Sequence, residues 1–172
     1  MRVFTIGHGR RPIEELLEVL SAAGVETLVD VRRFPGSRRN PQFNQVSLAS
    51  SLESVGIEYR HAVELGGRRS NEPGSERFPC IRVEAFRSYA ARMGSSEWQA
   101  TLAEVLATPS PCVMCAETPW TKCHRRFIAE LLVARGHEIV HLIRPHETEP
   151  HRLFDDSEVR EGRLYLCGEL VA

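Results

Sequence analysis

Short apolar runs alternate with helical patterns along most of the chain. Val3, Phe4 and Ile6 form an apolar run, as in a short buried strand, and the apolar positions between 13 and 20 follow helical spacing up to a stop at Gly24. The alternation then predicts strands in ETLVDVR, IEYRHAVEL, CVMCAE and HEIVHLI, and helices over 45–55, 83–93, 97–107 and 125–135. Strands that alternate with helices predict an α/β domain, with a mostly parallel sheet of about five strands flanked by helices.

The last thirty residues follow a different pattern. RPHETEPH, residues 144–151, is expected to be a polar connector, and VREGRLYLCGEL to form a terminal hairpin that turns at Glu161–Gly162. We therefore expect one domain over 1–172, with 144–172 as a C-terminal extension packing on it. The pattern does not give the order of the strands in the sheet.

Composition narrows the class of protein. Hydrophobic residues make up 42% and charged residues 26%, which is typical of a globular domain. With no export signal and no apolar run that could span a bilayer, we expect a cytoplasmic protein and no membrane partner. The five cysteines are an odd number in such a chain, so we expect reduced thiols rather than a disulfide framework.

The positions of the charged residues are more informative than their number. The net charge of -1 counts against a simple polyanion-binding protein. Lys122 is the only lysine, so nearly all basic residues are arginines, and only their clustering is informative.

Polar residues follow almost every predicted strand. Ligands of open α/β sheets bind outside the carboxyl ends of the strands, so these residues are expected to converge on one site. An alternative is that loops are polar anyway, that Asp30 only neutralises Arg32 or Arg33, and that His61 is a satisfied core histidine. The residues concerned are His8, Asp30, Arg32, Arg33, His61, Glu64, Arg68, Cys115, Glu117 and His141.

The stretch CAETPWTKCHRR contains the richest chemistry. Cys112 and Cys115 have CxxC spacing, but three residues apart on a strand they face opposite sides, so they cannot bind one metal ion. Cys115 and Cys123 are instead expected at the same rim. A helix N-terminus beside Arg125 favours a thiolate at Cys123 or a bound anion, and the alternative is a capping thiol without chemistry.

A second basic cluster lies in the loop PGSRRNPQF. It is expected to bring Arg38 and Arg39 to the same end of the sheet, where paired arginines bind phosphate or carboxylate. The alternative is a pair of solvated loop charges. No glycine-rich phosphate loop is present, since Gly7–His8–Gly9 is too short for a dinucleotide fingerprint.

The motifs TIGHGRRPIEELLEVL, LVDVRRFPGSRRNPQFN, ELGGRR and CAETPWTKCHRRFIAELLVARGHEIVHL occur in this order over nearly the whole chain. In them the chain resembles the bacterial and archaeal proteins called domain of unknown function 488. The resemblance implies an α/β fold and a cytoplasmic protein, and no established activity. The family usually has Ser where this chain has Gly9. The positions that match are His8, Asp30, Arg32, Pro35, Arg38, Asn40, Pro41, Glu64, Gly66, Gly67, Cys115, Glu117, Cys123, His124 and Arg125.

Together these features predict an enzyme, or an enzyme-like binder, of an anionic ligand such as a nucleotide, a nucleic acid or a phosphorylated metabolite. Two alternatives stay open, namely a non-catalytic nucleic-acid-binding module and a Cys/His metal-binding protein. The sequence indicates no particular cofactor, metal or oligomeric state. The candidate catalytic residues are Cys123 as nucleophile, Glu64 or Glu117 as general base, Asp30 and His8; the candidate ligand-binding residues are Arg32, Arg38, Arg39, Arg68, His124 and Arg125.

Overall fold

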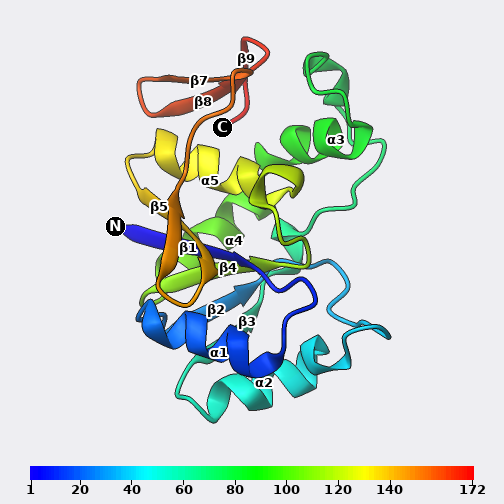
Figure 1. The fold of residues 1–172 in the computed structure, drawn as a ribbon. Helices are drawn as coiled ribbons and strands as arrows, with labels where there is room; N and C mark the ends of the chain where they lie inside the picture. The colour runs from blue at the N-terminus through cyan, green and yellow to red at the C-terminus, as the bar shows by residue number, and fades with distance from the viewer.

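Six strands form the central sheet of the computed structural model, which describes residues 1–172 (Figure 1). The order is β3-β2-β4-β1-β5-β6, and only β6 is antiparallel to its neighbour. The α/β class and the mostly parallel sheet are therefore confirmed. The strands are β1 (Arg2–Gly7), β2 (Thr27–Asp30), β3 (Glu58–His61), β4 (Pro111–Cys115), β5 (Glu138–Arg144) and β6 (Glu147–Pro150).

The chain reverses direction across the sheet between β1 and β4. The connection from β1 passes β4 to reach β2, whereas the connection from β4 passes β1 to reach β5. Loops that leave two neighbouring strands in opposite directions open a crevice at their carboxyl ends, where ligands of such sheets bind. Gly7 and Cys115 are paired in register at this point, so the loops that follow them form the two sides of the crevice.

Five helices cover the two faces of the sheet (Figure 1). One face carries α1 and α2, whose Leu16, Leu20 and Leu48 pack with Ile6 and Met114. The other face carries the remaining helices and the larger core cluster, which includes the fully buried Trp98. The helices are α1 (Ile13–Ala22), α2 (Gln45–Glu53), α3 (Glu84–Met93), α4 (Ser96–Leu106) and α5 (Arg125–Ala134).

The predicted helices agree with the observed ones to within two residues. The Ser95 hydroxyl caps α4 by accepting a hydrogen bond from the Trp98 amide at 3.3 Å. The third strand is shorter than expected, because Val63–Leu65 turns into a 3-10 helix before the two glycines. The expected polar connector is also wrong in part, since Glu147–Pro150 adds β6 to the edge beside β5.

The C-terminal segment forms a small antiparallel sheet of its own, β7 (Ser157–Arg160), β8 (Arg163–Leu166) and β9 (Glu169–Leu170). The predicted turn at Glu161–Gly162 is confirmed, with both residues at positive φ, as a tight hairpin requires. Leu164 and Leu166 bury themselves in the same core cluster as α5, so the hairpin covers the outer side of that helix (Figure 1).

One disulfide corrects the expectation that all five thiols are reduced. Cys80, before α3, is bonded to Cys167 in the turn after β8. The bond joins segments 87 residues apart, so it attaches the C-terminal sheet to the loop that leads into α3. Spacing in the sequence gave no sign of this pairing, because the hairpin and the loop meet only through the fold. Cys112, Cys115 and Cys123 remain free thiols.

We expect the disulfide to contribute to stability. A closed loop of this length restricts the unfolded chain, so Cys167→Ser should lower the free energy of unfolding by about 2–4 kcal/mol. Urea denaturation of the wild type and the variant, each with and without a reductant, measures this. A reductant should destabilise only the wild type; an equal effect on both proteins would contradict the assignment.

Candidate functional site

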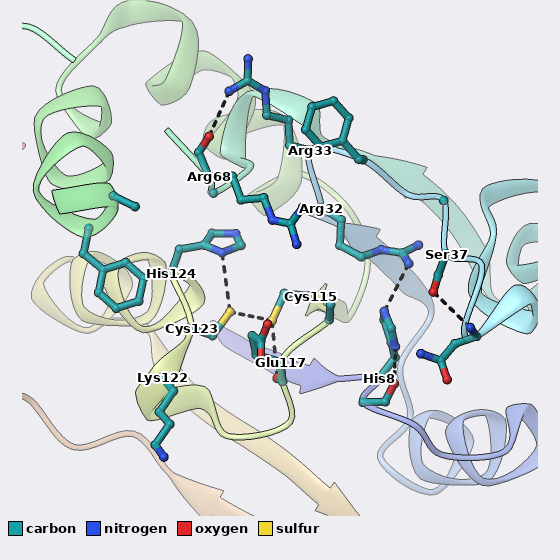
Figure 2. Close-up of a pocket in the computed structure, with 18 residues that line it drawn as sticks. His8, Arg32, Arg33, Ser37, Arg68, Cys115, Glu117, Lys122, Cys123 and His124 are labelled. Carbon is teal, nitrogen blue, oxygen red and sulfur yellow. Dashed lines mark hydrogen bonds between the residues drawn. The ribbon is translucent and has the colours of Figure 1, made fainter. Parts of the chain in front are cut away.

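A pocket of about 410 Å³ opens at the carboxyl ends of β1, β2 and β4 (Figure 2). It therefore lies at the crevice that the strand order predicts. Its base holds the sulfurs of Cys115 and Cys123, and basic side chains surround it. The residues with polar or reactive side chains that line it are His8, Arg32, Arg33, Ser37, Asn40, Arg68, Cys115, Glu117, Lys122, Cys123 and His124.

A buried arginine faces one of the two sulfurs. Arg125, at the start of α5, is only 2% exposed, and its Nη1 donates to Cys115 Sγ at 2.7 Å. The guanidinium also donates to the backbone carbonyls of Glu117 and Thr118, but it forms no ion pair with a carboxylate. Since a buried charge without a counterion is costly, the sulfur of Cys115 is the group that can balance it, as a thiolate.

The thiol of Cys123 stabilises the negative charge on Cys115. Cys123 Sγ lies 2.6 Å from Cys115 Sγ and can donate its S–H to it. Burial alone would raise the pKa of Cys115, but the hydrogen bond from Cys123 and the charge of Arg125 outweigh it and lower the pKa to about 7. Burial and the donated hydrogen bond raise the pKa of Cys123 above its usual value.

The thiolate is therefore assigned to Cys115, whereas the sequence analysis expected it at Cys123. Sequence reasoning placed it at Cys123 because the residue is near a helix start. In the structure Cys123 is extended and precedes the helix, with His124 as the N-cap of α5. Cys115 receives the guanidinium instead. The prediction that Cys112 and Cys115 face opposite sides of the sheet is confirmed, because they belong to different core clusters.

His124 lies beside the thiol pair, as its position in the motif implied. Its Nδ1 is 3.6 Å from Cys123 Sγ, and burial lowers its pKa to about 4, so the ring is neutral. Gly67 allows this placement: a Cβ there would lie 2.7 Å from His124 Nδ1. The second glycine of the GGRR motif is thus required by a close approach rather than by a turn.

Asp30, Arg32 and His8 form a connected group at the opposite side of the pocket. Asp30 is fully buried, and its carboxylate accepts from Arg32 Nε at 2.8 Å and from Tyr59 Oη at 2.9 Å. Arg32 Nη1 then lies 3.2 Å from His8 Nε2. Burial and the Arg32 charge lower the pKa of His8 to about 4, so His8 presents a neutral ring to the pocket.

Arg68 lines the pocket without a carboxylate partner, as do Arg33 and Lys122. It forms no ion pair, and Figure 2 shows its side chain extending over the pocket toward Arg32. Its backbone has φ of 56°, a left-handed conformation that is uncommon for a residue other than glycine. The Arg68 carbonyl accepts a hydrogen bond from Arg33 at 3.1 Å, which helps to hold the turn.

Five predicted site residues do not line the pocket. Two of them, Asp30 and Arg125, are bonded to the lining residues Arg32 and Cys115. The other three are Glu64, Arg38 and Arg39. Glu64 is partly exposed and pairs with Arg92 at 3.0 Å and Arg69 at 3.7 Å. Arg38 and Arg39 are exposed, while Ser37 and Asn40 on either side of them reach the pocket wall. Glu117 does line it, next to Cys115.

The remaining polar residues from the strand ends have structural partners. His61 Nε2 lies 2.8 Å from the Arg32 carbonyl, and His141 is paired with Thr5 and His151. Trp120 is buried and stacks on His141 with ring centroids 4.2 Å apart.

The thiols are too close together to share a metal ion. Two thiolates bound to one tetrahedral zinc lie about 3.8 Å apart, given Zn–S bonds of about 2.3 Å. Here the sulfurs are 2.6 Å apart, and Arg125 occupies the side where a cation would compete. No group of three or more His, Cys, Asp or Glu side chains is arranged to hold a metal ion.

Sequence reasoning missed the apolar part of the pocket. Phe34, 65% exposed, and Phe86 of α3 both line it. Phe34 directly follows the Arg32–Arg33 pair, so an exposed aromatic next to predicted ligand-binding arginines was an available signal. No feature of the sequence pointed to Phe86, because only the fold brings α3 to this end of the sheet.

A family model described as Domain of unknown function DUF488 matches residues 12–132. The match covers more than half of the chain. The chain belongs to this family. The matched span includes Asp30, Arg32, Arg68 and the whole cysteine motif, while His8 precedes it. No curated protein and no solved structure matches the chain. No helix in the structure is both long and apolar enough to cross a membrane.

The two acidic residues Asp30 and Glu64 are expected to differ in their effect on stability. Asp30→Asn leaves Arg32 buried without its counterion and should lower the free energy of unfolding by about 3–5 kcal/mol. Glu64→Gln removes a carboxylate that is 41% exposed, so its cost should stay below about 1 kcal/mol. Urea denaturation of both variants at pH 7 tests this, and equal losses would contradict it.

The thiolate assignment predicts which cysteine reacts first. Cys115 should be alkylated fastest by iodoacetamide, at a rate that rises with pH through about 7, because only the deprotonated form reacts. Cys112 should be slowest, since burial raises its pKa and it lies on the other face. Peptide mapping by mass spectrometry after partial labelling measures the order. Arg125→Met should move the profile to higher pH; an unchanged profile would show that Arg125 does not stabilise the thiolate.

Proposed function

We propose that the protein is an enzyme, or an enzyme-like binder, of an anionic, phosphate-bearing ligand held in this pocket. The observation that carries the proposal is Arg68, a guanidinium without a carboxylate partner that extends over the pocket toward Arg32 (Figure 2). Arg33 and Lys122, which also lack a carboxylate partner, add positive charge, and Glu117 is the one carboxylate in the pocket lining. A guanidinium that faces a concave site binds phosphate or carboxylate oxygens through two parallel hydrogen bonds.

In this proposal Cys115, rather than Cys123, is the nucleophile. Its sulfur lies in the pocket lining and carries the charge that Arg125 and Cys123 stabilise. Glu117 is the group that would serve as general base, since its carboxylate is in the lining and unpaired. His8 and His124 are neutral, so they contribute hydrogen bonds rather than charge.

Size and shape favour a small ligand. A volume of about 410 Å³ holds a mononucleotide or a phosphorylated metabolite. The exposed ring of Phe34 offers a face on which a nucleobase can stack, which favours a nucleotide within this class. The net charge of -1 counts against a nucleic-acid-binding module. The proposal includes a cytoplasmic location, where the Cys80–Cys167 bond is exposed to reduction.

Removing the unpaired arginine tests the proposal. Arg68→Gln should weaken binding of pyrophosphate and of adenosine monophosphate roughly tenfold or more, because a charge-assisted hydrogen-bond pair is lost. Arg38→Gln is the matched control, since Arg38 is exposed and outside the pocket, and it should leave binding nearly unchanged. Isothermal titration calorimetry at a fixed salt concentration measures both. Equal losses for the two variants would mean that the pocket is not the binding site.

A further inference from the structure

The two free thiols of the pocket are placed to form a bond with each other. Cys115 Sγ and Cys123 Sγ are 2.6 Å apart, only about 0.5 Å more than a disulfide requires. Both line the pocket, one at the end of β4 and the other just before α5. Closing the bond therefore needs the two sulfurs to approach each other by about half an ångström.

We propose that Cys115 and Cys123 are a redox-active dithiol that reduces small disulfides bearing carboxylate or phosphate groups. The inference rests on the proposed anion site for the charge of the substrate. It does not rest on that site for the dithiol itself, which is defined by the sulfur geometry.

The first step is a thiol–disulfide exchange at Cys115. The Cys115 thiolate attacks one sulfur of the substrate R–S–S–R, the Cys115–S–S–R bond forms, and R–S⁻ leaves. Arg125 has then lost the charge of its partner, and Cys123 has lost the acceptor of its S–H. The next acceptor within reach is His124, whose Nδ1 is 3.6 Å from Cys123 Sγ.

In the second step Cys115 and Cys123 form a disulfide with each other. Cys123 gives its proton to His124 and attacks Cys115 Sγ, so the Cys115–Cys123 bond forms and the second R–S⁻ leaves. The proton passes from His124 to a departing thiolate. Two electrons have moved from the two cysteines to the substrate. One half is released as a thiol with the proton of Cys123, and the other leaves as a thiolate that takes a proton from water. A neutral imidazole is needed at this step, which agrees with the buried ring of His124.

The other cysteines do not compete for this role. Cys112 lies on the opposite face of the sheet, in the core below α1. Cys80 and Cys167 already share a bond on the outside of the molecule, away from the pocket lining. The pocket charge selects the substrate, because Arg68 would attract an anionic disulfide and repel a cationic one.

Two disulfides of similar length and opposite charge provide the test. Reduced protein is mixed with 3,3′-dithiodipropionate, a dianion, or with cystamine, a dication, and quenched with acid at intervals. Peptide mapping by mass spectrometry then distinguishes the Cys115–Cys123 link from the Cys80–Cys167 link. We expect the Cys115–Cys123 link to form roughly tenfold faster with the dianion, and Arg68→Gln to remove most of that preference.

A second variant keeps the test decisive. Cys123→Ser retains Cys115 and Arg125, and should stop after the first step, with the propionate half trapped on Cys115. Absence of the Cys115–Cys123 link with both reagents, or no adduct on Cys115 in this variant, would overturn the dithiol. Link formation at equal rates with both reagents would overturn the anionic substrate and leave the dithiol standing. Pyrophosphate binding by the reduced protein is measured separately, so failure of the anion site is recognised independently.

Discussion

The charge on Arg125 is the constraint on which the site depends. A guanidinium buried at the start of a helix needs a counterion, and no carboxylate is provided. Cys115 provides one as a thiolate, and the loop between β4 and α5 folds so that two backbone carbonyls accept from the same guanidinium, whose Nε has no partner. Gly7 is required for the same reason, because a Cβ there would overlap the Glu117 carbonyl that Arg125 holds. The reactive sulfur is thus a consequence of how one buried charge is neutralised.

The opposite wall of the pocket neutralises its buried arginine differently. Arg32 receives a full carboxylate from Asp30, and its remaining donors reach His8 and the carbonyl of Phe43. That group is satisfied internally, which makes it a rigid scaffold that fixes the positions of His8 and Tyr59. Arg68 has no such partner. The site therefore combines two internally balanced arginines, Arg32 and Arg125, with lining residues whose positive charge has no carboxylate partner, and an anion completes the set. These residues are Arg33, Arg68 and Lys122.

The sequence predicted the fold and the location of the site from local patterns. Strand and helix periods gave the α/β class, and polar residues at the strand ends identified one edge of the sheet. It could not distinguish Cys115 from Cys123, because that choice depends on which sulfur a guanidinium ten residues along the chain reaches. The same limit explains Glu64, Arg38 and Arg39, which have suitable side chains but turn toward Arg92 or toward solvent. Contacts between distant segments, such as Cys80 with Cys167, leave no periodic signal at all.

The Cys80–Cys167 disulfide and the Cys115–Cys123 dithiol affect the pocket in different ways. The Cys80–Cys167 bond holds the C-terminal sheet to the segment that leads into α3, and α3 contributes Phe86 to the pocket wall. Reduction of this disulfide removes a constraint on the pocket wall at Phe86 and leaves Cys115 and Cys123 unchanged. Oxidation of Cys115 and Cys123 has the opposite effect: it leaves the wall in place but removes the thiolate that balances Arg125. Arg125 is then a buried cation without its counterion, so the oxidised site favours a bound anion in the place of the lost charge.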